Sequence, residues 1–215
     1  VPMNPMFREG EVEYQVTDAQ AETMIVHESV YPVVKSIRDK IGLKKIIIIG
    51  EKQPDTYSFH ELLERYDPSP PMYEYNARED LGALMYSSGT TGLPKGTMWT
   101  HHNLVANAIQ ITVHTDVNET DTYIMVLPLY HVYGLILGMA SAVLNGVSQV
   151  VMGRLDLVQW CKLVEEYQVT YSLCVPPLLN MILRHIEDPN VKGYDWSALH
   201  VMANGAAPVP TELVT

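Results

Sequence analysis

The sequence has few cysteines, and this shortage excludes two ways of stabilising a fold. Among 215 residues there are two cysteines, Cys161 and Cys174, and neither lies in a CxxC motif or a Cys/His cluster. A disulfide framework and a structural zinc site therefore both lack a basis. Two reduced, buried thiols in a cytosolic protein are the favoured interpretation.

Basic residues are also scarce. Lys and Arg together number 14 against 25 Asp and Glu, which gives a formal net charge of −11. Such a surface repels phosphate backbones, so we expect no nucleic-acid partner. A local nucleotide site remains compatible with this charge, because backbone N–H groups and a single lysine can hold phosphates.

The chain lacks the marks of a leader or a membrane span. Residues 1–6 have no basic region followed by an apolar run, so no signal peptide is expected. The first residue is not Met, which suggests that the chain begins partway into something longer. Asn145-Gly146 interrupts the apolar run Val132–Met152, whereas a span needs about 20 apolar residues. We expect a cytoplasmic protein without a transmembrane segment and make no prediction of its oligomeric state.

What the sequence does contain is an alternation of short β-rich runs with amphipathic segments. Hydrophobic residues make up 47% and charged residues 18%, as in a globular domain. The alternation predicts an α/β fold, a mostly parallel sheet flanked by helices. The predicted strands are 23–26, 45–49, 81–86, 122–127, 149–152, 171–175 and 199–203. The predicted helices are 30–41, 59–65, about 102–115, one after 133, 156–167 and 176–185. The strand 45–49 is predicted to be buried on both faces.

The sharpest motif is the run from Tyr86 to Gly96, Tyr-Ser-Ser-Gly-Thr-Thr-Gly-Leu-Pro-Lys-Gly, directly after a predicted strand. Glycines let the backbone turn its N–H groups toward an anion, hydroxyls donate to phosphate oxygens, and a lysine adds positive charge. The run is not a Walker A loop, because Lys95 follows Pro94 and precedes Gly96. A polar hairpin or linker is the alternative. The predicted phosphate-binding residues are Ser87, Ser88, Gly89, Thr90, Thr91, Gly92 and Lys95.

A second motif groups an imidazole with phenols. Leu127-Pro-Leu-Tyr-His-Val-Tyr-Gly134 follows a predicted strand and precedes a helix. His131 could orient a carboxylate or stabilise negative charge during attack, and Tyr133 could form a wall of the acyl or nucleotide pocket. By itself the cluster is more often core packing. Ligands of open parallel sheets bind at the carboxyl ends of strands, where this motif falls.

The glycine–threonine run resembles the phosphate-binding signature of the adenylate-forming superfamily, which includes acyl-CoA synthetases, aryl-CoA ligases, luciferases and peptide-synthetase adenylation domains. Thr100-His-His-Asn-Leu104 and the opening segment Asn4–Val16, which looks like a family segment preceding a helix, are similar to the family as well. The Tyr-His-x-Tyr cluster resembles its second signature, beside the carboxylate substrate. The resemblance implies that residues 1–215 are part of the large N-terminal AMP-binding domain.

The resemblance adds further site residues. Asn204-Gly-Ala-Ala-Pro208 is similar to the stretch that lines the adenine and acyl pocket, which implies binding roles for Gly205, Ala206 and Ala207; a strand-to-helix turn is the alternative. Arg154 aligns with a basic position near the CoA phosphates, although a solvated arginine is the more common reading. Lys95 and His131 are the implied catalytic residues, and His131, Tyr133 and Arg154 the implied substrate-binding residues.

The implied activity is an ATP-dependent carboxylate–CoA ligase, with ATP and Mg²⁺ as cofactors and CoA as co-substrate. The family's Mg²⁺ ligand and its small C-terminal domain are not in this sequence, so we expect these residues alone to be inactive. Aliphatic residues favour a fatty or other apolar acid; they are Leu135, Ile136, Leu137, Val175, Leu178 and Leu179. The alternatives are a non-catalytic nucleotide-binding module, a luciferase, or a carrier-protein-loading adenylation domain.

Overall fold

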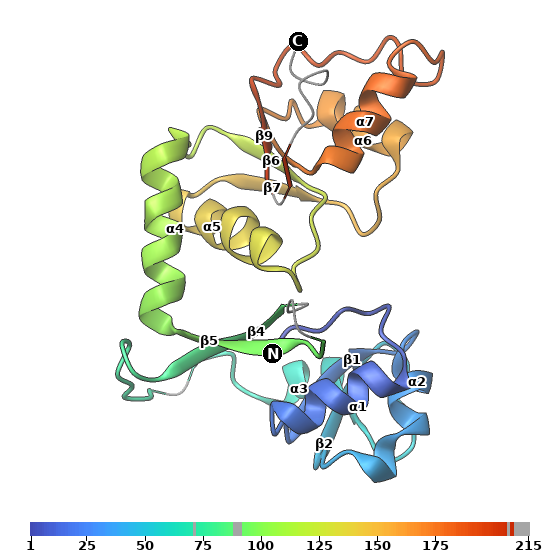
Figure 1. The fold of residues 1–215 in the computed structure, drawn as a ribbon, viewed down its shortest axis with the longest axis vertical. Coiled ribbons are helices and arrows are strands. Elements are labelled where there is room, and N and C mark those ends of the chain that lie inside the picture. Colours follow the sequence, from blue (N-terminus) through green and yellow to red (C-terminus); the bar gives the residue numbers. More distant parts are fainter. Residues whose placement is uncertain (71, 88–91, 206, 209–215) are drawn as a thin grey trace. The chain divides into compact units, whose positions relative to one another are not determined.

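The chain divides into two compact units, Val1–Thr100 and His101–Thr215, each of which has its own layers. Figure 1 shows the ribbon of this computed structural model. The structure describes residues 1–70, 72–87, 92–205 and 207–208. The α/β class predicted from the alternation of elements is confirmed, with parallel sheets and helices packed on them.

The first unit contains a parallel three-stranded sheet and an antiparallel hairpin. The sheet has the order β1-β2-β3, and β4 pairs with β5 in the hairpin. Its elements are α1 (Glu9–Asp18), β1 (Thr23–His27), α2 (Tyr31–Ser36), the 3₁₀ turn η1 (Arg38–Lys40), β2 (Lys45–Ile49), β3 (Tyr57–Ser58), α3 (Phe59–Arg65), β4 (Leu81–Ser87) and β5 (Lys95–Thr100).

Three predictions for the first unit need correction. The opening segment Asn4–Val16 does not simply precede a helix, because α1 begins inside it at Glu9 and runs on to Asp18. The predicted helix 30–41 ends at Ser36, where Ile37 leaves helical geometry (φ −116°, ψ 5°) and the chain continues as a 3₁₀ turn. The strand 45–49 is not buried on both faces: Ile46 and Ile48 are buried, whereas Ile47 is half-buried.

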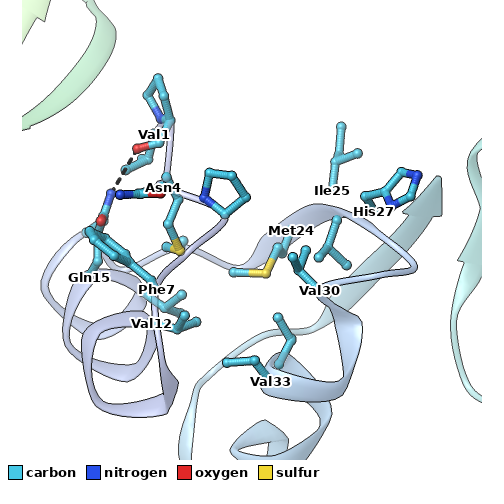
Figure 2. A pocket seen from close by; sticks show the side chains of 18 of the residues that line it. Val1, Asn4, Phe7, Val12, Gln15, Met24, Ile25, His27, Val30 and Val33 are labelled. Atoms are coloured by element: carbon cyan, nitrogen blue, oxygen red, sulfur yellow. Dashed lines mark hydrogen bonds between the residues drawn. The ribbon is translucent and has the colours of Figure 1, made fainter. Parts of the chain in front are cut away.

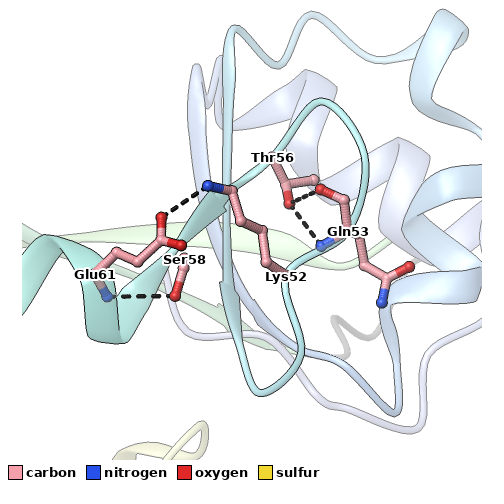
Figure 3. A network of polar contacts seen from close by, with 5 residues as sticks. All are labelled: Lys52, Gln53, Thr56, Ser58 and Glu61. Atoms are coloured by element: carbon pink, nitrogen blue, oxygen red, sulfur yellow. Dashed lines mark hydrogen bonds and ion pairs between the residues drawn. The ribbon is translucent and has the colours of Figure 1, made fainter.

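Local capping explains the start of α3. Ser58 is its N-cap, and the Ser58 side chain accepts a hydrogen bond from the backbone N–H of Glu61 at 3.3 Å. Figure 3 shows this cap together with the ion pair between Lys52 and Glu61 and the Thr56–Gln53 hydrogen bonds in the preceding turn. The Lys52–Glu61 pair is exposed on both sides, so its contribution to stability is small.

The second unit is a four-stranded parallel sheet with helices on both faces. The strand order is β7-β6-β8-β9, and every pairing is parallel. The elements are α4 (His101–Thr115), β6 (Thr122–Met125), the π-helix η2 (Tyr133–Ala140), α5 (Ser141–Asn145), β7 (Ser148–Val151), α6 (Leu157–Glu166), β8 (Tyr171–Cys174), α7 (Pro176–His185) and β9 (Val201–Asn204).

The alternation of side chains along β6 divides the core of the second unit into two layers. Ile124 packs with residues of α6 and α7, including Trp160 and Leu178. Its neighbours Tyr123 and Met125 pack on the opposite side with Tyr133 of η2 and with Ala142 of α5. Helices α6 and α7 therefore cover one face of the sheet, and η2 with α5 covers the other.

Sequence signals set the ends of these helices. Asp156 is the N-cap of α6, as predicted, and its carboxylate accepts from the N–H of Gln159 at 2.8 Å. Pro176 begins α7, as predicted from its fixed φ. Gly146 ends α5 in the left-handed conformation (φ 68°) and breaks the apolar run 132–152 into helix, turn and strand. Among the described residues no helix is long and apolar enough to cross a membrane.

Both cysteines are free and buried in the second unit. They belong to the layer beneath α6 and α7. Burial raises the pKa of the Cys161 thiol to about 11 and also raises the pKa of the Cys174 thiol. At neutral pH both thiols are protonated and act as small apolar side chains rather than as nucleophiles.

Candidate functional site

The glycine–threonine segment follows a strand, as predicted, but it joins two antiparallel strands that form a sheet of their own. Strands β4 and β5 pair with Ser87 directly opposite Lys95, so these two residues lie side by side at the neck of the hairpin. Both are exposed. Gly92 has φ +124°, a conformation that favours glycine. Four predicted phosphate ligands lie outside the described residues: Ser88, Gly89, Thr90 and Thr91.

The neck of the hairpin therefore presents a hydroxyl and an ammonium group on adjacent strands. A hydroxyl donates one hydrogen bond and an ammonium group three, and the ammonium adds a compact positive charge. This pair suits an anion with several oxygens, such as a phosphate. The sequence identified both residues, but it did not predict that β5 brings them together.

His131 lies in the segment between β6 and η2, and its backbone is held by a turn. The backbone N–H of His131 donates to the carbonyl of Pro128 at 3.1 Å. Its Nδ1 accepts from the backbone N–H of Tyr133, also at 3.1 Å. Because Nδ1 is used as an acceptor, the neutral ring carries its proton on Nε2. The exposed imidazole therefore offers an N–H donor to a carboxylate or an oxyanion.

His131 also lines a small pocket in the second unit. The pocket has a volume of about 220 Å³ and lies beyond the carboxyl ends of β6 and β8. Its lining is mainly apolar, and it consists of Val126, Leu127, Pro128, His131, Tyr133, Gly134, Leu155, Val175 and Leu178. An imidazole at the edge of an aliphatic pocket suits a molecule with one anionic end and one apolar end. Of the aliphatic residues predicted for an acyl site, Val175 and Leu178 lie here.

Tyr133 forms a wall of this pocket, but its hydroxyl is not free to act on a ligand. The Tyr133 hydroxyl donates to the carbonyl oxygen of Ala203, at 3.0 Å, and to that of Cys174, at 3.3 Å, so these two acceptors share its one proton. Tyr133 thereby connects η2 to Cys174 at the end of β8 and to Ala203 in β9. Burial, followed by the negative potentials of Cys174 and Tyr171, raises the pKa of Tyr133 to about 12.

Tyr133→Phe is expected to reduce the free energy of unfolding by about 1–2 kcal/mol at pH 8, because the hydrogen bond from the Tyr133 hydroxyl to the Ala203 carbonyl is lost. The raised pKa adds stability that is present below the unfolded-state pKa of about 10 and disappears as the pH rises toward about 12. Wild type should therefore lose stability more steeply than Tyr133→Phe over this window.

Denaturant unfolding at pH 8, 10, 11 and 12 measures this difference. The matched control is Tyr167→Phe, which removes the hydroxyl of a tyrosine that is 51% exposed. Its curve should run parallel to that of wild type. Parallel curves for wild type and Tyr133→Phe would contradict the assigned hydrogen bonds.

The predicted adenine and acyl stretch begins where β9 ends. At Gly205, an added Cβ atom would lie 2.8 Å from Cζ of Tyr133, so the group that approaches this glycine closely is an aromatic ring of the chain itself. Ala206 lies outside the described residues. Ala207 is exposed, and its carbonyl accepts from Asn204 Nδ2 at 3.2 Å. Direct contact of these residues with a nucleotide stays a prediction.

Asn204 is a candidate that sequence reasoning did not single out. Its Oδ1 atom is buried and has no hydrogen-bond donor within the described part of the chain. A buried acceptor without a donor is costly, and a ligand N–H group would satisfy it. An asparagine at the end of a predicted strand, next to glycine, was the available signal.

Arg154 is exposed in the loop that follows β7, and the next residue, Leu155, lines the pocket. The guanidinium makes no hydrogen bond or ion pair with another described residue. This position fits either a phosphate contact or a solvated arginine. Among the described residues there is no group of three or more His, Cys, Asp or Glu side chains that could hold a metal ion. We therefore assign no Mg²⁺ site to these residues.

A larger pocket, of about 510 Å³, lies in the first unit between α1, β1 and α2 and contains none of the predicted site residues. Figure 2 shows its apolar lining, including Phe7, Met24 and Val30. Its buried amide, Gln15 Nε2, already donates to the Pro2 carbonyl at 3.0 Å. The lining is therefore mainly apolar, although it also includes His27 and Thr23.

The fold and the two motifs define an α/β protein with a glycine–threonine hairpin and an imidazole at the carboxyl edge of a parallel sheet. The chain belongs to the AMP-binding enzyme family, whose model matches residues 1–215. A curated relative, 4-coumarate–CoA ligase 1 from Petroselinum crispum, is 35% identical over 98% of this chain and 38% of its own length.

Solved structures agree with this assignment. A long-chain-fatty-acid–CoA ligase from Archaeoglobus fulgidus matches with a TM-score of 0.90 and 35% identity, over 99% of this chain and 42% of that chain. An anthranilate–CoA ligase in complex with anthranoyl-AMP matches with a TM-score of 0.86 and 25% identity, over 98% of this chain and 41% of that chain. The chain thus spans about two fifths of the length of these relatives.

Proposed function

We propose that this chain is the part of an ATP-dependent carboxylate–CoA ligase that binds the phosphates of ATP and the carboxylic acid. In the first reaction a carboxylate oxygen attacks the α-phosphorus of ATP, the bond to the β-phosphate breaks, and pyrophosphate leaves. In the second reaction the CoA thiol loses its proton and attacks the acyl carbon, and AMP leaves. The family membership supports this activity, and so do the relatives reported above, each of which is named as a CoA ligase.

The pocket lined by His131 is the observation that carries the proposal for the acid. The His131 imidazole donates from Nε2 to the carboxylate, because Nδ1 already accepts from the Tyr133 backbone N–H. That donor orients the nucleophilic oxygen and offsets negative charge as the reaction proceeds. Tyr133 contributes a wall rather than a proton, since its hydroxyl is held by two carbonyls.

Ser87 and Lys95 are the described residues that would hold the β- and γ-phosphates and then pyrophosphate, together with Gly92 and the four loop residues between them. Gly205, Ala206 and Ala207 would lie along the nucleotide or acyl group, and Arg154 near the CoA phosphates. Mg²⁺, when bound, supplies charge neutralisation on the phosphates.

The acid itself is proposed to be apolar, fatty or aromatic. The aliphatic lining of the pocket supports this choice. The relatives include a ligase named for the aromatic acid 4-coumarate and one named for long-chain fatty acids. An aromatic acid is therefore a candidate substrate alongside the fatty or other apolar acid that the sequence favoured.

Carboxylate-dependent exchange of labelled pyrophosphate into ATP tests the proposal. The assay uses the longest chain that the coding region supplies, with separate pools of fatty and aromatic acids. Exchange that depends on one pool is the expected result, and consumption of CoA should follow. A folded chain that binds ATP but catalyses no exchange would favour a non-catalytic nucleotide-binding module. Exchange without CoA consumption would favour a luciferase or a carrier-protein-loading domain.

A further inference from the structure

Helix α1 presents two different faces within the first unit. Val12 and Val16 are buried in the core beneath β1 and β2. Tyr14 and Asp18 are also four residues apart, so they share a face, and the rotation of about 100° per residue directs that face away from the two valines. One side of α1 therefore serves the core, and the other side is available to a neighbour.

That neighbour is the hairpin that carries the predicted phosphate-binding residues. Tyr14 Oη donates to the backbone carbonyl of Pro94 at 2.8 Å, across 80 positions of sequence. Tyr86 Oη donates to Asp18 Oδ2 at 2.5 Å, across 68 positions. A single helical turn of α1 thus bonds to both sides of the hairpin, to Tyr86 in β4 and to Pro94 just before β5.

Both bonds meet the hairpin next to its functional end. Tyr86 directly precedes Ser87, and Pro94 directly precedes Lys95, while Ser87 and Lys95 are partners across the hairpin. The Tyr86 ring also lies over Gly96 of the opposite strand, where an added Cβ atom would stand 3.0 Å from Cζ. Each of the two hydrogen bonds from α1 therefore reaches the hairpin one residue away from a predicted phosphate ligand.

The position of Asp18 is unfavourable for the helix alone. It is the last residue of α1, whose final turn has no basic side chain, and a negative charge at a helix C-terminus opposes the helix dipole. The Tyr86 hydroxyl provides the compensating donor. Burial, followed by the hydrogen bond to Asp18, raises the pKa of Tyr86, so this hydroxyl keeps its proton at neutral pH.

We propose that Tyr14 and Asp18 are positioning residues that hold Ser87 and Lys95 in register for the phosphates of ATP. This role rests on the proposed function of the hairpin. It assigns to α1 a part in nucleotide binding that is exerted through its two hydrogen bonds to the hairpin. Tyr14 acts through the backbone carbonyl of Pro94, and Asp18 acts through the side chain of Tyr86. We call Tyr14 and Asp18 the α1 anchors of the hairpin.

Tyr14→Phe and Asp18→Ala test the proposal in the longest available chain. Each variant removes one anchor and leaves Ser87 and Lys95 in the sequence. Each is expected to raise the KM for ATP about fivefold, the effect of losing one ordinary hydrogen bond, with little change in the KM for the acid. Asp18→Asn keeps an amide oxygen that can accept from Tyr86, so it should restore a KM within about twofold of wild type.

Two matched controls separate positioning from general stability. Tyr57→Phe removes a hydroxyl from a tyrosine that is 49% exposed on β3, and Asp39→Asn removes an exposed charge in η1. Both should have wild-type KM values. An equal rise in the KM for ATP and for the acid, or no recovery in Asp18→Asn relative to Asp18→Ala, would overturn the proposal.

A second measurement does not depend on activity. Trypsin can cut after the exposed Lys95, and cleavage of a paired strand requires local opening of the hairpin. Cleavage at Lys95–Gly96 should be about fivefold faster in Tyr14→Phe and Asp18→Ala than in the controls. Unchanged cleavage would overturn the anchoring, even if wild type catalyses exchange. If wild type shows no exchange but the two variants are still cleaved faster than the controls, Tyr14 and Asp18 hold the hairpin and only the proposed function fails.

Discussion

Lys95→Ala is expected to slow acyl-adenylate formation about 100-fold, which corresponds to about 2.7 kcal/mol of lost transition-state stabilisation. In the proposed reaction negative charge grows on pyrophosphate as its bond to the α-phosphorus breaks, and the proposed role of the Lys95 ammonium is to offset that charge where it develops. The side chain is exposed at the first position of β5. Its removal therefore leaves no cavity, and the free energy of unfolding should change by less than about 0.5 kcal/mol.

Two further variants make this result specific. Lys45→Ala removes an exposed lysine from the first position of β2, so it matches the change in charge and should keep the wild-type rate. Lys95→Arg keeps a positive charge but replaces the compact ammonium by a planar guanidinium, and it should recover only part of the rate. Pyrophosphate exchange measures all three variants. A wild-type rate in Lys95→Ala would remove this residue from the mechanism.

Most elements of the second unit were predictable because their signals are local. An aspartate N-cap, a proline at the first turn and a glycine after the last turn mark helix ends within a few residues of chain. Asp156, Pro176 and Gly146 each perform the predicted function in the structure. The β-branched and aromatic runs between these helices predict strands. The alternation of strands and helices along the chain then predicts the α/β class.

The hairpin was missed because its second strand carries no clear burial pattern. Along β5 the side chains are exposed or half-buried, so the sequence of Lys95–Thr100 has no apolar alternation to recognise. The π-helix was missed for a different reason. Its geometry depends on packing of η2 against the sheet, and the apolar residues 133–140 are equally compatible with an ordinary α-helix.

The site shows the same division between local and long-range information. Sequence order placed His131 and Gly205 after strands, and the structure puts both at the carboxyl edge of the second sheet. The role of the Tyr133 hydroxyl was not predictable, because its two acceptors lie 41 and 70 positions away. The α1 anchors of the hairpin escaped prediction for the same reason, since each joins residues far apart in the sequence.

Gly134→Ala is expected to reduce the free energy of unfolding by about 1–3 kcal/mol and to impair adenylation further than this loss explains. An added Cβ atom at Gly134 would stand 2.4 Å from the carbonyl oxygen of Pro128, which is backbone and cannot rotate away. The same oxygen accepts the hydrogen bond from the His131 backbone. Relief of the clash therefore displaces the turn that presents the imidazole to the pocket.

Gly153→Ala is the matched control, because this glycine is in the same unit and an added Cβ atom there has nothing within 4 Å. We expect its free energy of unfolding and its exchange rate to stay close to wild type, within about 0.5 kcal/mol for the former. Denaturant unfolding and pyrophosphate exchange, both measured at a temperature where each variant is folded, separate the two effects. If Gly134→Ala loses stability but keeps the wild-type exchange rate per folded molecule, the geometry of this turn does not control His131, and the imidazole is held by the Tyr133 backbone alone.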